Sequence, residues 1–211
     1  DIYQVAKDSE YFIGAVHENE VENGKQLVKM LLDKGDRNIG LIGWEQGDAT
    51  WLGRWEGYKA GIEEWNKENP DDQAKLSEPQ YAGTSSDGGS KAAEALMSAD
   101  DTIDALIPAG GGGDPLQGAI AAVERAGKVD EIDVVSTDFL PDLGERLENG
   151  SMAGESGGHF CDPLYAFLMV YNAIKGNYTD IAGNFVDVEF PYLYVSSPED
   201  YEAYEKYFVD Q

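Results

Sequence analysis

Residues 39–65 read IGLIGWEQGDATWLGRWEGYKAGIEEW, a short apolar run followed by a longer amphipathic one. Ile39 to Ile42 has the length and composition of a strand buried in a parallel sheet. After it, large apolar side chains recur at helical spacing and predict one face of a helix that Asn69-Pro70 ends; they are Trp51, Trp55, Tyr58, Ile62 and Trp65. A strand that leads into such a helix indicates a βα unit.

The same alternation of strand and helix continues on both sides of this unit. Further strands are expected at 11–16, around 79–81, and at 105–107, 132–135, 152–156 and 185–190. Helical stripes of apolar residues are expected at 24–31, 92–97, 116–123, 143–147, 163–174 and, after a capping box at Ser197, 201–208. The pattern predicts an α/β fold, in which helices flank a Rossmann-like parallel sheet with right-handed crossovers.

The charge balance limits the partners of the chain. It carries 41 acidic and 15 basic residues, a net charge of −26, and such a surface repels nucleic acids and anionic membranes. The apolar run around Tyr165 to Val170 is far below the roughly 18 residues of a membrane helix. We therefore expect a globular protein with no nucleic-acid partner.

Polar and aromatic residues follow the predicted strands. In open parallel sheets, ligands bind beyond the carboxyl ends of the strands, so the residues there are the candidates for a site. They are His17-Glu18-Asn19, Trp44-Glu45-Gln46, Tyr81, the segment 110–114, Thr137-Asp138 and Gly158-His159. Carboxylates and amides bind hydroxyl groups and aromatic faces stack on sugar rings, so this set favours a small polar ligand of the sugar or polyol kind.

Arg54, which lies close to the same edge of the sheet, and Asp138 each have two competing interpretations. Arg54 is expected in the first turn of its helix, where the helix dipole disfavours a cation, so it binds either a ligand or one of the many acids in a surface salt bridge. Asp138 directly follows a strand, where a carboxylate can accept two hydroxyl hydrogen bonds or can simply form a turn.

The residues that would support chemistry are missing from the pattern. His17 and His159 have no carboxylate or cysteine at metal-ligand spacing, and no Gly-x-Ser-x-Gly elbow is present. The glycine run 110–113 is not followed by Lys-Ser/Thr, so a turn is favoured over a phosphate loop. We expect no catalytic residue, no metal and no cofactor, and therefore a binding protein that is not an enzyme.

Four motifs, in order, resemble the ribose- and galactose-type periplasmic binding proteins. Residues 16–24 resemble their first crossover, and Arg54-Trp55-Glu56-Gly57-Tyr58 after the 39–43 strand is similar to their RxxGF signature. Residues 134–138 resemble their fifth strand with its aspartate, and residues 149–152 resemble the turn before the last crossover. The resemblance covers residues 11–195. The loop at 112–118 departs from the family pattern, so the ligand need not be a standard pentose or hexose.

The resemblance implies a type I fold with two lobes and a ligand trapped between them. It also implies an extracytoplasmic solute-binding component of an ABC transporter, in the periplasm or as a cell-surface lipoprotein, with a permease as its partner. The expected ligand is a sugar or similar molecule, and the candidate ligand-binding residues are Glu18, Asn19, Trp44, Arg54, Asp114, Asp138 and His159.

By comparison with that family, we expect an N-terminally truncated chain whose first lobe is incomplete. Residues 1–17 would be a remnant of the N-terminal lobe, 18–158 the ligand-binding lobe, 159–184 a segment that returns toward the first lobe, and 185–211 a terminal strand and tail helix. The helix at 163–175 would then lose its partner surface. Its apolar residues would repack on the remaining lobe, form a dimer contact or meet another chain; they are Phe167, Leu168, Tyr171 and Ile174.

Two alternatives remain open on the sequence. A lactose-repressor-type regulator shares this architecture in its effector domain, but it needs a helix-turn-helix and a DNA partner that the charge of −26 disfavours. An enzyme on a doubly wound fold needs a nucleophile and base, or a metal cluster, at the strand ends.

Overall fold

The computed structural model describes residues 2–9, 11–110, 114–177 and 185–209. Two compact units can be distinguished by their internal contacts. The larger unit consists of Glu20–Gly157 and Leu193–Gln211, and the smaller unit consists of Asp1–Asn19 and Gly158–Tyr192. The division into four segments expected from the sequence stays a prediction.

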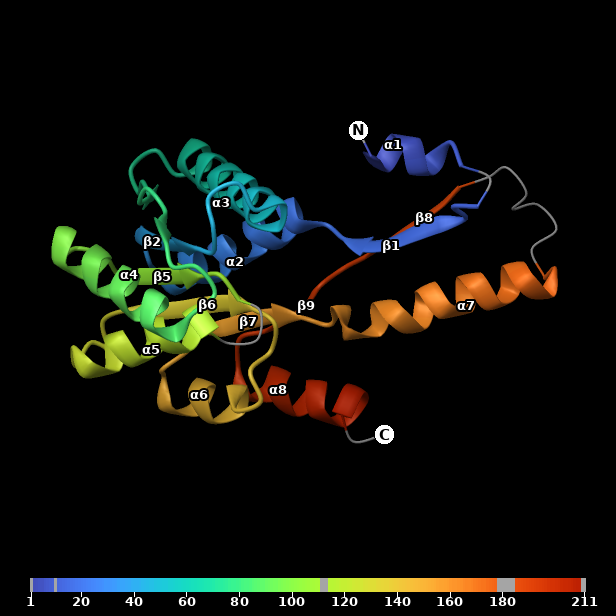
Figure 1. Cartoon of the computed structure of the whole chain (residues 1–211). Coiled ribbons are helices and arrows are strands. Elements are labelled where there is room, and N and C mark those ends of the chain that lie inside the picture. The colour runs from blue at the N-terminus through green and yellow to red at the C-terminus, as the bar shows by residue number, and fades with distance from the viewer. Residues whose placement is uncertain (1, 10, 111–113, 178–184, 210–211) are drawn as a thin grey trace. The chain divides into compact units, whose positions relative to one another are not determined.

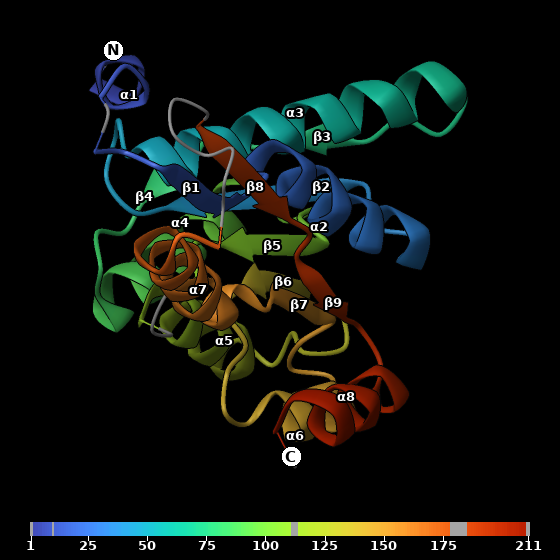
Figure 2. The same ribbon diagram turned by 90° about the vertical axis from the view of Figure 1, so that its right-hand side faces the viewer.

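The larger unit is built on a mostly parallel sheet in the strand order β3-β2-β5-β6-β7-β9, with β4 also paired to β2 (Figures 1 and 2). The central strands are β2 (Asn38–Gly43), β5 (Ala105–Pro108), β6 (Asp133–Thr137) and β7 (Gly154–Gly157). Short strands lie at the edges, namely β3 (Lys75–Leu76), β4 (Gln80–Tyr81) and β9 (Leu193–Val195), which is antiparallel to β7. The carboxyl ends of the parallel strands therefore share one edge of the sheet.

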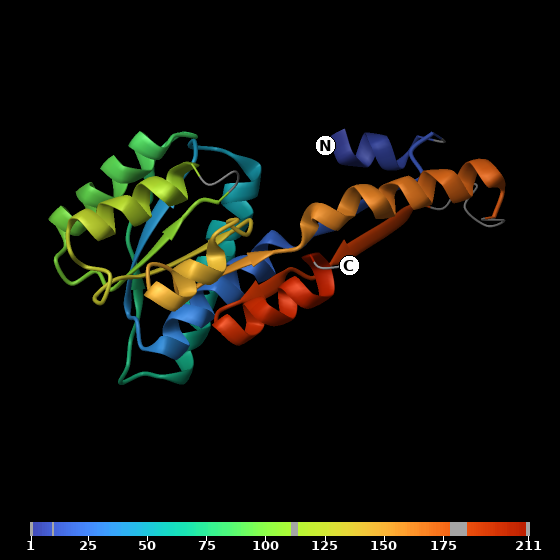
Figure 3. The same cartoon turned by 90° about the horizontal axis from the view of Figure 1, so that it is seen from below.

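Helices cover both faces of this sheet (Figure 3). One face carries α2 (Glu20–Lys34) and α3 (Ala49–Glu68), and the other carries α4 (Ser86–Ala99), α5 (Asp114–Arg125) and α6 (Leu143–Asn149). The tail helix α8 (Pro198–Tyr204), continued by a π-helical turn η2 (Glu205–Val209), packs beside α6. Successive residues of the central strands enter opposite cores: Leu41 packs with α2 and α3, and Ile42 with α4 and α5.

The smaller unit contains α1 (Ile2–Lys7), a two-stranded parallel sheet of β1 (Gly14–Glu18) and β8 (Val186–Phe190), the 3-10 turn η1 (His159–Cys161), and α7 (Asp162–Lys175). Tyr165 on α7 stacks on Phe190 with ring centroids 4.3 Å apart. Met169 lies close to Gly14, where a Cβ would overlap its sulfur atom. The strand and helix of this unit are thus joined by side-chain packing along one side of α7.

The predicted α/β class and the order of strands and helices are confirmed. The expected strand at 11–16 is shifted, because pairing with β8 starts only at Gly14 and continues to Glu18. Tyr11 is exposed, and Phe12 packs on the ring of Phe185 instead of joining the sheet. Neither β3 nor β9 was predicted, since two or three residues carry too little apolar pattern to be recognised.

The side chains expected to lose their partner surface are exposed in this chain. The exposed fraction is 63% for Phe167 and 79% for Ile174, and Leu168 and Tyr171 are exposed too. The smaller unit by itself therefore does not cover these residues, and their repacking on the remaining lobe stays a prediction. The alternatives, a dimer contact or a contact with another chain, stay predictions.

Two glycines bring α2 and α3 into backbone contact. A Cβ at Gly57 would overlap the carbonyl oxygen of Val21 and lie 2.9 Å from the Cα of Gly24. A Cβ at Gly24 would overlap the carbonyl oxygen of Arg54. The two helices can approach this closely only because neither position has a side chain. The contact places the start of α2 beside Arg54.

None of the helices in the described residues combines the length and the apolar character that crossing a membrane requires.

Candidate functional site

The loop after β2 and the beginning of α3 place Trp44 and Arg54 together at the carboxyl edge of the larger unit's sheet. The guanidinium carbon of Arg54 lies 5.4 Å from the ring centroid of Trp44, within range of a cation–π interaction. Asp138 follows β6, whose carboxyl end lies at the same edge. The larger unit thus carries an aromatic face, a cation and a carboxylate where ligands of open parallel sheets bind.

Arg54 is more deeply buried than the sequence indicated. It is the sixth residue of α3, in the second turn and not the first, and its exposed fraction is 4%. Its Nε donates to Oε2 of Glu20 at 2.7 Å, and its Nη2 to Oε1 at 3.4 Å. The salt bridge considered as an alternative therefore exists, but it is buried on the arginine side. Glu20 holds the guanidinium in place and neutralises its charge.

Asp138 has a backbone conformation that few non-glycine residues adopt. Its φ is 78°, in the left-handed region, and its N–H donates to the carbonyl oxygen of Ser156 on β7 at 2.8 Å. Aspartate tolerates this region better than most residues, so the turn-forming interpretation is correct for the backbone. Backbone strain of this kind concentrates at functional sites, so the conformation fits a ligand role for the side chain as well.

A buried polar network supports the segment around Asp138. Oγ1 of Thr137 accepts hydrogen bonds from Nδ2 of Asn23 on α2 at 3.1 Å and from Oγ of Ser156 at 3.0 Å. One residue before Ser156, Oε2 of Glu155 accepts the N–H of Leu140 at 2.7 Å. These bonds attach the end of β6 and the loop after it to α2 on one side and to β7 on the other.

Glu155 is a fully buried carboxyl group. Desolvation raises its pKa to about 8, the hydrogen bond from Leu140 opposes the shift, and the charge of Asp138 adds to it. Its other oxygen, Oε1, is buried and has no hydrogen-bond partner in the described part of the chain. The group is therefore neutral in the folded protein at neutral pH.

This protonation predicts a pH dependence of stability. Between the ordinary pKa of 4.5 and about 8, the folded state holds a proton that the unfolded state releases, so the free energy of unfolding falls as the pH rises through this window. Glu155→Gln removes the contribution. The quantity to compare is the free energy of unfolding of the variant minus that of the wild type, obtained from thermal melts. We expect this difference to be more favourable to the variant at about pH 8.5 than at about pH 4.5, by a few kcal/mol.

The exposed Glu148→Gln variant on α6 is the control, and its difference from wild type should not change over the same range. An equal change for both variants would contradict a neutral Glu155.

The other candidate residues lie in the smaller unit or in part outside the described structure. Glu18 ends β1, and Nδ2 of Asn19 donates to Glu189 at 3.4 Å. His159 begins η1, with its ring 5.7 Å from that of Tyr192. Their convergence with Arg54 and Asp138 stays a prediction. Asp114 begins α5, but its side chain lies outside the described residues, as does the glycine segment 111–113.

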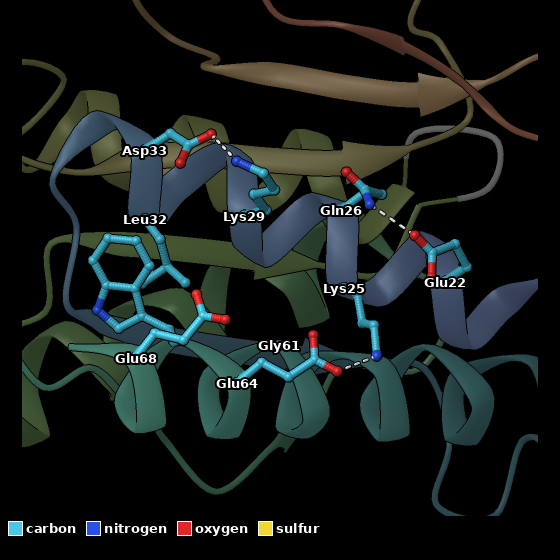
Figure 4. A pocket seen from close by; sticks show the side chains of 10 residues that line it. Glu22, Lys25, Gln26, Lys29, Leu32, Asp33, Gly61, Glu64 and Glu68 are labelled. Atoms are coloured by element: carbon cyan, nitrogen blue, oxygen red, sulfur yellow. Dashed lines mark hydrogen bonds and ion pairs between the residues drawn. The ribbon is translucent and has the colours of Figure 1, made fainter. Parts of the chain in front are cut away.

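Two hollows of the larger unit differ in how well they suit a ligand. One, of about 530 Å³, lies at the strand edge and is lined by Trp44, Glu45, Gln46, Gly47, Asp48 and Thr84. The other, of about 330 Å³, lies along α2 and α3 (Figure 4). In that groove Lys25 pairs with Glu64 and Lys29 pairs with Asp33, so its charged groups satisfy one another. The hollow beside Trp44 is the better candidate because it lies at the carboxyl edge of the sheet, although its lining includes Trp44 and neither Arg54 nor Asp138.

Sequence reasoning missed Glu20 and Asn23, the two α2 residues that hold Arg54 and Thr137. Both precede the apolar stripe of α2, and their partners lie 34 and 114 residues away in sequence. No pattern in the sequence specifies such pairs. Among the residues that the structure describes, no cluster of three potential metal ligands is found.

Comparisons with known proteins agree with this architecture. A family profile described as a periplasmic binding protein domain matches residues 6–171. No curated protein sequence matches the chain significantly.

Three solved structures illustrate the similarity of fold. An ABC transporter solute-binding protein from Bacillus halodurans with bound myo-inositol is 24% identical, with a TM-score of 0.70, over 92% of this chain and 63% of that one. The binding protein of the arabinose ABC transporter from Shewanella sp. ANA-3 is 20% identical, with a TM-score of 0.70, over 96% of this chain and 66% of that one. A Caulobacter myo-inositol binding protein is 18% identical, with a TM-score of 0.72, over 88% of this chain and 60% of that one. The chain thus spans less than two thirds of the length of each.

Proposed function

Because this chain belongs to the periplasmic binding protein domain family, we propose that it is the solute-binding component of an ABC transporter and binds a neutral sugar or cyclic polyol. One observation carries the proposal. Trp44, the ion-paired Arg54 and the strained Asp138 all lie at the carboxyl edge of one sheet, where an aromatic face, a donor and an acceptor can contact a hydroxylated ring. The solved structures of similar fold that contain myo-inositol or arabinofuranose support this ligand class.

The charges at this edge argue for a neutral ligand. Glu20 neutralises Arg54, and Glu45, Asp48 and Asp138 add negative charge. A sugar acid or sugar phosphate would be repelled there, since desolvated like charges cost several kcal/mol. A neutral polyol avoids this cost and can donate its hydroxyl hydrogens to the carboxylates.

The remaining parts of the proposal follow from the family. Glu18, Asn19 and His159 would complete the ligand contacts, the protein would work outside the cytoplasm, and it would deliver its ligand to a permease without changing it chemically. The matches to transporter solute-binding proteins support this function over that of a lactose-repressor-type regulator.

A thermal-shift screen tests the proposal. The panel contains four neutral compounds, myo-inositol, D-allose, L-arabinose and D-glucose, and one anion, D-glucuronate. A ligand at 100 times its Kd adds about 2.7 kcal/mol, which raises the melting temperature of a chain of this size by roughly 5–10 °C. We expect such a shift with at least one neutral compound and none with D-glucuronate. Stabilisation by D-glucuronate alone, or by no member of the panel, would contradict the proposed ligand class.

A further inference from the structure

The first turn of α2 contacts Arg54 and Thr137, the residue that immediately precedes Asp138. Glu20 and Asn23 are three residues apart and therefore project from the same side of the helix. Glu20 holds the guanidinium of Arg54, with Nε and Oε2 2.7 Å apart. Asn23 is fully buried, and its Nδ2 donates to Oγ1 of Thr137 at 3.1 Å. One helical turn thus bridges α3 and the carboxyl end of β6.

The bond from Asn23 reaches Asp138 within one residue. Thr137 is buried and immediately precedes Asp138, and it also accepts the hydroxyl of Ser156 at 3.0 Å. Ser156 in turn accepts the N–H of Asp138 through its carbonyl oxygen at 2.8 Å. The conformation with φ of 78° at Asp138 is thus fixed by β7 on one side and, through Thr137, by α2 on the other.

Asn23 is an unfavourable residue for stability alone. Its Oδ1 is buried and accepts no hydrogen bond from the described residues. A buried acceptor without a partner is destabilising, and an apolar side chain of similar volume would avoid this. The amide is therefore better explained by what its Nδ2 positions than by the stability it adds.

We infer that Asn23 is a positioning residue for ligand binding, which, together with Glu20, sets the placement of Asp138 relative to Arg54. This inference rests on the proposed function. The Glu20–Arg54 bond and the Asn23–Thr137 bond share one helical turn, so a shift of that turn moves both ligand contacts together. Asn23 itself need not touch the ligand.

The test is Asn23→Leu, in the intact protein, by calorimetric titration with whichever of myo-inositol, D-allose, L-arabinose and D-glucose it binds. Leucine keeps the branched shape and the number of heavy atoms of asparagine but removes the bond to Thr137, whose hydroxyl keeps its hydrogen bond from Ser156. We expect an unchanged or raised melting temperature, and a Kd about three- to tenfold higher than that of the wild type. Such a change is equivalent to the loss of one hydrogen bond.

A buried asparagine at the opposite edge of the same sheet provides the matched control. Asn38 begins β2 and bonds to Asp100 and Thr102. Asn38→Leu should lower the melting temperature and leave the Kd of the folded protein unchanged. A purely structural role for Asn23 would give that same pattern, a lower melting temperature with an unchanged Kd, and would overturn the inference.

Thr137→Val removes the same bond from its other end and decides the matter if Asn23→Leu does not fold. Its Kd should rise by the same three- to tenfold. The double variant Asn23→Leu/Thr137→Val should bind the ligand no more weakly than the weaker of the two single variants. A wild-type Kd in Thr137→Val would overturn the inference while leaving the proposed function intact. Failure of the unchanged protein to bind any of the four compounds would instead overturn the proposed function, and this inference with it.

Discussion

Replacing Gly57 by alanine should destabilise the larger unit by about 3 kcal/mol, or roughly 6–12 °C in melting temperature. The new Cβ would overlap the carbonyl oxygen of Val21, a backbone atom of α2 that cannot rotate away as a side chain could. The helices α2 and α3 would have to separate, and the packing of Trp51 and Tyr58 against α2 would loosen. Thermal and urea unfolding of the variant would measure the cost.

The matched control for Gly57→Ala lies one turn further along the same helix. A Cβ at Gly61 would lie 3.4 Å from the nearest atom, on Val28, which is about an ordinary contact. Because alanine favours the helix over glycine, Gly61→Ala should be neutral or stabilising by up to about 1 kcal/mol. Equal melting temperatures for the two variants would show that the close approach of α2 and α3 does not constrain residue 57.

Replacing Asp138 by asparagine should weaken ligand binding by about 10- to 100-fold while leaving the fold intact. A hydrogen bond to a charged group contributes roughly 1.5–3 kcal/mol, which corresponds to that range. Asparagine adopts the left-handed region as readily as aspartate, so the backbone with φ of 78° is retained. The Kd from calorimetric titration with a neutral panel sugar, and the melting temperature, would be measured together.

Asp138→Gly separates the side chain from the backbone. Glycine relieves the strain of the positive φ but adds conformational entropy to the unfolded chain, so stability should stay within about 1 kcal/mol of wild type. Binding should weaken at least as much as in Asp138→Asn. If both variants bind the sugar like wild type, Asp138 is only a turn residue and has no ligand role.

The parts of the fold that could be predicted from the sequence are those in which each element buries a regular apolar pattern. The stripe from Trp51 to Trp65 predicted α3 because helical periodicity and burial coincide there. The strand β2 was predicted because all six of its residues are buried between two layers of helices. In contrast, Tyr11 belongs to an apolar run but remains exposed, so the start of β1 was misplaced.

The site could be predicted only as far as the strand ends. Topology requires that Trp44 and Asp138 lie at one edge of the sheet, and the sequence pattern contains that information. The partner of Arg54 could not be predicted, since any of 41 acidic residues could have paired with it. The buried network of Asn23, Thr137 and Ser156 depends on contacts between residues far apart in sequence, which local sequence patterns do not specify. Aspartate is compatible with a left-handed φ, but the bond of Asp138 to Ser156 that accompanies this conformation is a tertiary contact that the residue type does not specify.

A crystal structure of the intact protein, grown with the neutral panel compound that gives the largest thermal shift, tests the central claim most directly. The account predicts electron density for the sugar within hydrogen-bond distance of the Asp138 carboxylate and the Arg54 guanidinium, beside the ring of Trp44. Density for the sugar in the groove between α2 and α3, or anywhere away from the carboxyl edge of the sheet, would contradict it.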